Sequence, residues 1–254
     1  MCVHPFFFAG NQVVGGPTIP SPERSLDSTS NSPNTALRST SDIPSVSDGY
    51  IVAGWFMRTG TGNNDTIWCN EDGSDQIYTN PSHQLQFRYG NSGTSGGTVA
   101  FTLELNTWYF IWVRFGLNIS GSDDAIAQVI EQDGTVHTAS TNTATVASST
   151  TTTAQLHYVL GDDPSTGVSS DDGYLGRWFA LGFYDSASLT ADDLGCNSSG
   201  KQKDISASAF SASVYLLFGK NASDAGEDAS GNGNNFTNES TAITLSTSDL
   251  PVAA

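Results

Sequence analysis

Two segments of this sequence are apolar at nearly every position, and they restrict the possible folds more than any other feature. Residues 50–58 read YIVAGWFMR and residues 107–115 read TWYFIWVRF. Both are too short to span a membrane and are rich in the aromatic and β-branched residues that favour strands. Because side chains of a strand alternate between its two faces, such a strand must be buried on both. The two segments therefore predict central strands between layers of structure.

Other segments have the two-residue period of strands with one buried face. Residues 84–89 place Leu85, Phe87 and Tyr89 on one side, and residues 99–105 repeat the alternation. Residues 125–132 lead into Asp133-Gly134, a dipeptide typical of hairpin turns, and out through residues 135–138. Apolar segments at 156–160, 177–184, 214–218 and 242–245 complete the predicted strands. About a dozen short strands separated by turns indicate an all-β, antiparallel two-sheet sandwich.

One short helix is predicted near residue 190. Thr190 can cap a helical turn, Asp193 stands three residues later, and Gly195 can end the turn. The sequence shows no repeat of the solenoid or propeller type. We therefore expect a single sandwich domain over residues 36–254, including the C-terminal strands.

Residues 1–35 differ in composition from the remainder. Three phenylalanines in a row precede a stretch with four prolines, which exclude a regular helix or central strand. We interpret residues 1–35 as an extended N-terminal arm that serves as an assembly anchor, or as an arm folded back on its own domain. The anchor residues are Phe6, Phe7 and Phe8.

The chain is strongly acidic. It has 26 Asp and Glu against 9 Lys and Arg among 254 residues, a formal net charge of −17. Such a charge repels phosphate backbones, so nucleic acid is not an expected partner. The first ten residues lack a basic region and contain Pro5, so they predict no signal peptide. No segment is long enough for a membrane span.

The cysteines do not suggest a metal site. Cys2, Cys69 and Cys196 have no CxxC spacing and no histidine pair nearby. An odd, sparse set favours reduced and mostly buried thiols, with a pair between Cys69 and Cys196 as the alternative.

The order of several motifs resembles the laminin-G-like and concanavalin-A-like jelly rolls. The segments are GYIVAGWFMR, LNTWYFIWVRF, EQDG and YLGRWFALGFYDSASLTADDL, and the similarity covers roughly residues 36–220. The resemblance implies a jelly-roll sandwich. The positions that match the family pattern are Trp55, Trp108, Trp112, Asp133, Gly134, Gly182, Tyr184, Leu189, Thr190 and Leu194.

The C-terminal segment VYLLFGKNASDAGEDASGNGNNFT is similar to segments that follow such modules in bacteriophage virion proteins. A virion protein is made in the host cytoplasm without a signal peptide, and it ends up on the outside of a particle. That route fits an acidic, lysine-poor chain without an export signal. The resemblance therefore implies a virion surface location, with an extracellular location as the alternative.

Some jelly rolls of this kind are retaining glycosidases, which need two carboxylates about 5 Å apart across the sugar bond. In that family the acids alternate along one strand, whereas the six glutamates here form no alternating set. A glycoside hydrolase is therefore the least favoured reading, and we expect no catalytic residues and no enzymatic activity.

Two kinds of ligand site remain as expectations. The resemblance implies that loop carboxylates and amides could hold calcium, the only cofactor considered, although solvated turn residues explain the same pattern. Aromatic side chains in loops could stack on sugars, although for Trp68 a place in the core of a short strand beside Ile67 is the favoured reading. The calcium candidates are Asp162, Asp163, Asp171 and Asp172 in one loop, and Asp228, Asn232 and Asn234, with Asp224, in another. The sugar candidates are Trp68 and Tyr78.

These features favour a non-enzymatic virion surface protein: a capsid decoration, head-fibre or tail-associated protein anchored by its N-terminal arm. The expected partners are other capsid or tail proteins and further copies of the same chain. The alternative is a carbohydrate-binding adhesion module for surface glycans, with calcium as a candidate cofactor. The two readings are compatible, because a shell protein can also bind sugars.

Overall fold

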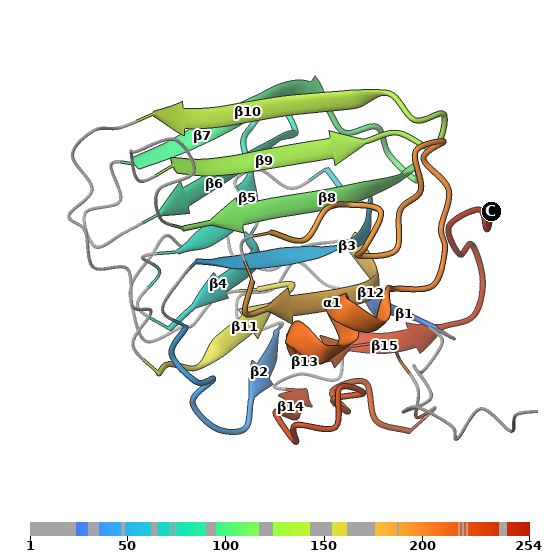
Figure 1. The fold of residues 1–254 in the computed structure, drawn as a ribbon. Coiled ribbons are helices and arrows are strands. Elements are labelled where there is room, and N and C mark those ends of the chain that lie inside the picture. The colour runs from blue at the N-terminus through green and yellow to red at the C-terminus, as the bar shows by residue number, and fades with distance from the viewer. Residues whose placement is uncertain are drawn as a thin grey trace, which may run out of the picture.

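The computed structural model describes residues 24–29, 36–46, 49–61, 66–71, 73, 75–89, 95–116, 124–142, 154–161, 176–186, 188–217, 219, 221, 223–238 and 243–254. Within these residues two antiparallel sheets face each other, and a short helix lies against the larger one (Figure 1). The predicted all-β two-sheet sandwich is confirmed.

The larger sheet has eight described strands in the order β10-β9-β8-β3-β12-β1-β15, and β13 pairs with β12 beside this path. Their bounds are β1 (Ser25–Ser28), β3 (Tyr50–Arg58), β8 (Trp108–Phe115), β9 (Asp124–Ile130), β10 (Val136–Asn142), β12 (Gly176–Tyr184), β13 (Ser213–Leu217) and β15 (Ile243–Ser246). The smaller sheet has seven described strands in the order β14-β2-β11-β4-β5-β6-β7. Their bounds are β2 (Leu37–Ser39), β4 (Thr66–Asn70), β5 (Gln76–Thr79), β6 (Gln84–Tyr89), β7 (Ser95–Thr102), β11 (His157–Val159) and β14 (Phe236–Asn238).

Most of the longer strands lie where the periodicity predicts them, whereas β7 begins four residues before the predicted segment 99–105 and ends at Thr102, which leaves Leu105 40% exposed. The bounds of β3 and β6 coincide with the predicted segments, and the turn at Asp133-Gly134 joins β9 to β10. Gly134 has a φ of 91°, a conformation that glycine adopts without strain. The sequence does not predict β1, β2, β5 and β14, which have only three or four residues each. Segments this short do not show a period.

The doubly apolar strands are buried on both faces, as predicted. On β3, Val52 and Phe56 point into the core between the sheets, whereas Ile51, Trp55 and Met57 point outward into a second apolar cluster. Strands β8 and β12 divide their side chains in the same way. The outer cluster is closed by residues 189–212, which include the helix α1 (Ala207–Ala212), and by residues near Leu250. The larger sheet therefore lies between two hydrophobic layers (Figure 1).

Three tryptophans attach the covering segments to this sheet. The indole nitrogen of Trp55 donates to the carbonyl of Gly195 at 3.2 Å, and that of Trp112 donates to the carbonyl of Leu189 at 3.3 Å. Trp108 donates to the carbonyl of Asp249. Each indole ring thus packs in the outer cluster, while its nitrogen donates to a backbone carbonyl of the segments that cover this cluster. This explains why these positions of the jelly-roll pattern carry tryptophan.

The expected boundary between arm and domain at residue 35 is wrong for one stretch. Ser25–Ser28 form β1 inside the larger sheet, paired with both β12 and β15, and Leu26 is fully buried there. Asp27 forms an ion pair with Arg177 of β12 at 3.0 Å. Residues 25–28 therefore belong to the sandwich, and an arm can comprise only the residues before them.

The expected helix at Thr190 is also wrong in its extent. Thr190 and Asp193 make the predicted capping bonds, with the Thr190 amide donating to the Asp193 carboxylate at 2.9 Å. Gly195 follows with a φ of 104° and ends the segment after a single turn. The helix of the described residues is α1, capped by the Ser206 hydroxyl, which accepts from the amide of Ala209 at 3.1 Å.

Candidate functional site

The outer face of the smaller sheet carries a polar and aromatic surface centred on Tyr78. Tyr78 is half-buried on β5, and the guanidinium of Arg88 on β6 lies 5.0 Å from the centre of its ring. Arg88 Nε also donates to the Tyr78 hydroxyl at 3.2 Å. Because Ile77, Leu85 and Phe87 fill the inner face, strand alternation directs Tyr78 and Arg88 away from the core.

Neighbouring side chains on this face are tied together across the strands. Gln86 donates its amide to the Thr98 hydroxyl at 2.8 Å, and Gln76 donates to the Thr66 hydroxyl at 2.7 Å. These bonds fix the side-chain rotamers before any ligand arrives, which lowers the entropic cost of binding. We call Tyr78, Gln86, Arg88 and Thr98 the Tyr78 face, since the neighbouring Thr66 and Gln76 are buried. It offers an aromatic ring beside an amide, a hydroxyl and a cation.

Trp68 has no part in this surface. Its side chain is fully buried in the core between the sheets, and its indole nitrogen donates to the Tyr215 hydroxyl at 2.8 Å. The expectation that Trp68 stacks on a sugar is therefore wrong, and the favoured place in the core is correct. The register shift between Thr66 and Trp68 places Ile67 and Trp68 in the same core although they are adjacent in sequence.

A buried histidine lies next to Trp68. The His157 ring makes edge contacts with Trp68, Phe183 and Tyr215, and its Nδ1 lies 3.4 Å from the Tyr215 hydroxyl. Burial lowers the pKa of His157 to about 3, so the imidazole is neutral at physiological pH. No solvent-facing substrate can reach a ring in this position, and we assign it a structural role.

The two described cysteines are buried free thiols. Cys69 and Cys196 form no disulfide, so the expected reduced state is confirmed and their pairing is excluded. Burial raises the pKa of Cys196 to about 12, with a smaller contribution from the charge of Asp192. A thiol with this pKa is protonated at neutral pH and is a poor nucleophile.

The loop after β13 contains four of the calcium candidates, of which Asp228, Asn232 and Asn234 are joined to β13 by hydrogen bonds. The Asp228 carboxylate accepts from the amides of Leu216, Ser230 and Asn234 at 2.9 to 3.0 Å and from the Ser230 hydroxyl at 2.8 Å. Asn232 and Asn234 donate their side-chain amides to carbonyls of β13 at 2.8 Å. These bonds fold residues 228–234 onto β13. Calcium binding by Asp228, Asn232 and Asn234 stays a prediction, and it would have to replace several of them.

The other predicted site residues lie outside the described residues. They are Phe6, Phe7 and Phe8 of the anchor and Asp162, Asp163, Asp171 and Asp172 of the second calcium loop. Among the residues that are described, no three His, Cys, Asp or Glu side chains are close enough together to hold one metal ion.

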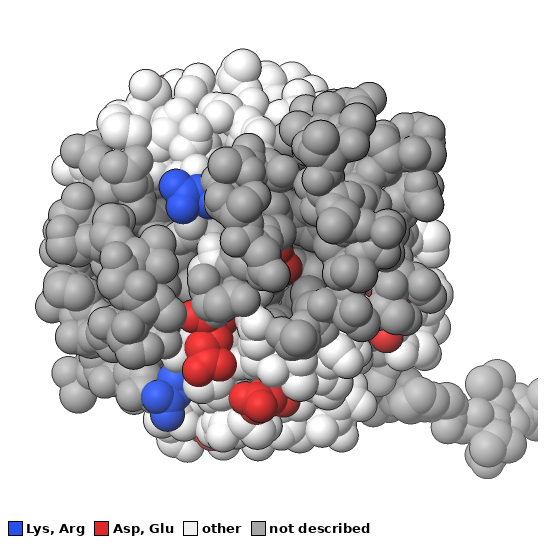
Figure 2. Space-filling view, turned by 90° about the vertical axis from the view of Figure 1, so that its left-hand side faces the viewer, with Lys and Arg blue, Asp and Glu red and all other residues white. Residues whose placement is uncertain are grey.

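Two basic side chains of the described part, one buried and one at the surface, are bound by groups of the chain itself. Arg58 is 5% exposed, and its guanidinium donates to the carbonyls of Leu103 and Gly60. Lys203 pairs with Asp192 at 2.9 Å. On the side seen in Figure 2, described acidic side chains gather in the lower part, while basic ones appear as separate spots.

The fold is shared with known proteins, although no protein-family model and no curated protein sequence matches this chain. A protein of proposed carbohydrate-binding function from Bacteroides ovatus superimposes with a TM-score of 0.64 at 14% identity, over 92% of this chain and 62% of that one. A heptameric SAP-like pentraxin from Limulus polyphemus gives 0.54 at 14% identity, over 72% of this chain and 88% of that one. Tailspike protein 2 of an Escherichia coli O157:H7 bacteriophage gives 0.40 at 13% identity, over 76% and 25%.

These similarities define the fold as a jelly roll of the concanavalin-A-like and laminin-G-like kind, as the sequence resemblance implies. At 14% identity they establish the architecture and nothing about the ligand. The tailspike likeness, with its TM-score of 0.40, supports no further inference. No helix in the described part of the chain is long and apolar enough to cross a membrane.

Proposed function

We propose that this chain is a non-enzymatic carbohydrate-binding module that uses the Tyr78 face. The observation that carries the proposal is the half-buried Tyr78 ring on the outer side of the smaller sheet, with the Arg88 guanidinium over one face of the ring. A sugar presents an apolar C–H face and a rim of hydroxyls, so it needs one aromatic surface and several polar groups around it. The similar fold of a protein with proposed carbohydrate-binding function supports this choice of ligand.

The chemistry of the Tyr78 face supports binding without turnover. On the Tyr78 face the polar groups are an amide, hydroxyls and a guanidinium, none of which is a general acid or base at neutral pH. Among the described residues, the neutral His157 and the protonated Cys196 are buried. The face can hold and orient a saccharide, and it offers no pair of carboxylates to cleave one.

Replacing Tyr78 by alanine is expected to weaken binding of the best glycan on an array about tenfold. The reason is the loss of the ring contact, since about 1.4 kcal/mol corresponds to a factor of ten in affinity. The Tyr78→Phe variant keeps the ring and loses the bond to Arg88, so it should keep most of the affinity. The measurement is array binding followed by titration of the best glycan. An Ala variant that binds like the wild type would contradict the role of this face.

We further propose that the module is displayed on the surface of a virion, with other capsid or tail proteins and further copies of the chain as partners. The supporting features are the net charge of −17, which keeps a shell protein soluble, and the similarity of the C-terminal segment to virion proteins. In this proposal the anchor is the segment before β1, with Phe6, Phe7 and Phe8 as its contacts, and calcium at residues 162–172 remains a candidate cofactor.

Removing residues 1–23 is expected to abolish incorporation into particles while the melting temperature stays unchanged. The cut stops before β1, because Leu26 and the Asp27–Arg177 ion pair belong to the larger sheet. Particle content is measured by quantifying the protein in purified virions, and folding by thermal unfolding of the free domain. Normal incorporation of the shortened chain would refute the anchor.

A further inference from the structure

A pocket of about 430 Å³ lies on the other sheet, on the side opposite the Tyr78 face. Its apolar lining comes from Leu250 and Val252 and from the nearly buried Met57 and Trp108, which are neighbours across β3 and β8. Polar groups of Asn106, Thr107, Gln132, Arg177 and Asp249 complete the lining. Neither the sequence motifs nor the proposed function uses this pocket.

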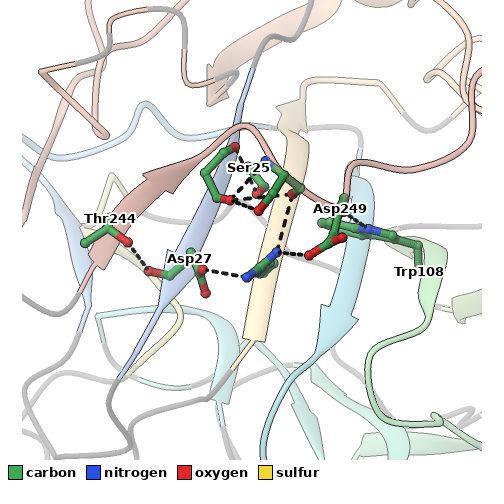
Figure 3. A network of polar contacts seen from close by, with 8 residues as sticks. Ser25, Asp27, Trp108, Thr244 and Asp249 are labelled. Atoms are coloured by element: carbon green, nitrogen blue, oxygen red, sulfur yellow. Dashed lines mark hydrogen bonds and ion pairs between the residues drawn. The ribbon is translucent and has the colours of Figure 1, made fainter.

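Arg177 enters the pocket wall from β12 with only part of its hydrogen-bonding capacity used. It is held by Asp27 at 3.0 Å, while its contacts to the Asp249 carboxylate and the Ser248 carbonyl are long, at 3.5 and 3.4 Å (Figure 3). Its buried Nε has no hydrogen-bond partner among the described residues. Trp108 donates to the backbone carbonyl of Asp249, which keeps that residue at the pocket (Figure 3).

The Asp249 side chain is 76% exposed, so its carboxylate is open to solvent and only loosely tied to Arg177. The pair therefore presents a donor and an acceptor side by side at one pocket wall. Two adjacent hydroxyls of a sugar ring match this arrangement, because each hydroxyl both donates and accepts. One hydroxyl can accept from Arg177 while its neighbour donates to Asp249. The ring C–H groups would then face the apolar lining, in which Leu250 and Val252 are more exposed than Met57 and Trp108.

Charge selects among small polar ligands. Asp27 neutralises Arg177, so the exposed carboxylate of Asp249 leaves the pocket wall with an excess negative charge. The chain as a whole has a net charge of −17, which disfavours an anionic ligand. A neutral ring avoids this repulsion, and its vicinal hydroxyls can use both Arg177 and Asp249.

We propose that this pocket is a second saccharide site, specific for a single neutral sugar ring bound between Arg177 and Asp249 on one side and Trp108 and Met57 on the other. It deepens the proposed carbohydrate function with a site of different chemistry. The Tyr78 face is an open surface suited to an extended glycan, whereas the pocket is a partly open recess. The two sites lie on opposite sheets, so a chain with both could bridge two saccharides.

The test is a titration of the full chain with neutral hexoses, with a hexuronic acid as the charged comparator, followed by calorimetry and by ligand-observed NMR. Asp249→Gly removes the acceptor and suits the local backbone, since Asp249 has a φ of 54°. The matched control is Asp192→Ala, which removes another exposed carboxylate that pairs with a cation. We expect saturable hexose binding that Asp249→Gly weakens at least tenfold and Asp192→Ala leaves unchanged.

Three results would overturn the proposal: no saturable binding of any hexose at millimolar concentration, equal affinity in Asp249→Gly and wild type, or tighter binding of the hexuronic acid than of the hexose. Thermal unfolding of each variant shows that the comparison is made on folded protein. The outcome is separable from that of the glycan array. If the chain binds hexoses but no glycan on the array, only the proposal for the Tyr78 face is refuted. If it binds array glycans but no hexose, only the proposal for the pocket is refuted.

Discussion

Lowering the pH from 6.5 to 4 is expected to reduce the free energy of unfolding by about 3 kcal/mol through His157 alone. Burial lowers the pKa of His157 from 6.5 in the unfolded chain to about 3 in the folded one. Above pH 6.5 both states are neutral at this residue and it contributes no pH dependence. Between pH 6.5 and 3 the unfolded chain binds a proton that the folded chain excludes. Stability is therefore lost as the pH falls, by about 1.4 kcal/mol per pH unit.

The measurement is urea denaturation at several pH values in wild type and in His157→Phe. The many carboxylates of this chain also titrate, so the informative quantity is the difference between the two slopes. His157→Phe fits the aromatic surroundings made by Trp68, Phe183 and Tyr215 and cannot be protonated. We expect its stability to fall less steeply with acid than that of the wild type.

Tyr215→Phe is the matched control. It removes the hydroxyl near His157 Nδ1 and the acceptor of the Trp68 indole, so it lowers stability at every pH. The histidine stays in place, and the cause of its lowered pKa is desolvation, so the wild-type slope should persist. Equal slopes in wild type and His157→Phe would contradict the assignment.

The sequence predicts the central part of the fold because that part follows local rules. A strand that is buried on both faces has to be apolar at consecutive positions, and β3 and β8 have this pattern. The tryptophans of these strands mark the outer cluster, since each needs a buried ring position and a nearby carbonyl. The turn at Asp133-Gly134 follows from the preference of glycine for positive φ.

The remainder depends on contacts that are distant in sequence. Nothing in residues 25–28 shows that they pair with both β12 and β15, because the Asp27–Arg177 ion pair joins residues 150 positions apart. Trp68 lies in a short polar stretch and is buried because of a register shift in β4. Tyr78 was a sugar candidate from the sequence, but its partner Arg88 could be identified only once β5 and β6 were paired. The pocket at Arg177 shows no sequence signal, since its lining comes from five separate segments.

Exchange of Asp228 for asparagine is expected to reduce the free energy of unfolding by about 3 kcal/mol. Each carboxylate oxygen of Asp228 accepts two donors, from Leu216 and Ser230 on one oxygen and from Ser230 and Asn234 on the other. In the variant one oxygen becomes an amide nitrogen, which cannot accept. Whichever way the amide turns, at least one backbone N–H at this buried position then faces a donor and loses its partner.

The control is Asp224→Asn in the same loop. Asp224 is exposed, and its carboxylate accepts from the amide of Gly226 at 2.9 Å, so we expect a loss of less than about 0.5 kcal/mol. Urea denaturation of wild type and both variants provides the comparison. Similar losses in the two variants would contradict the idea that residues 228–234 are held by one buried carboxylate.

The same variants test calcium binding by Asp228, Asn232 and Asn234. A cation that binds only the folded chain raises its stability in proportion to the logarithm of the free calcium concentration. If these residues are ligands, calcium should stabilise the wild type and leave Asp228→Asn unchanged, because the variant lacks the only carboxylate among them. If calcium stabilises neither, the Asp228 carboxylate serves only to fold the loop onto β13. If calcium stabilises both proteins equally, the ion binds elsewhere in the chain. Residues 162–172 would then be the first segment to mutate.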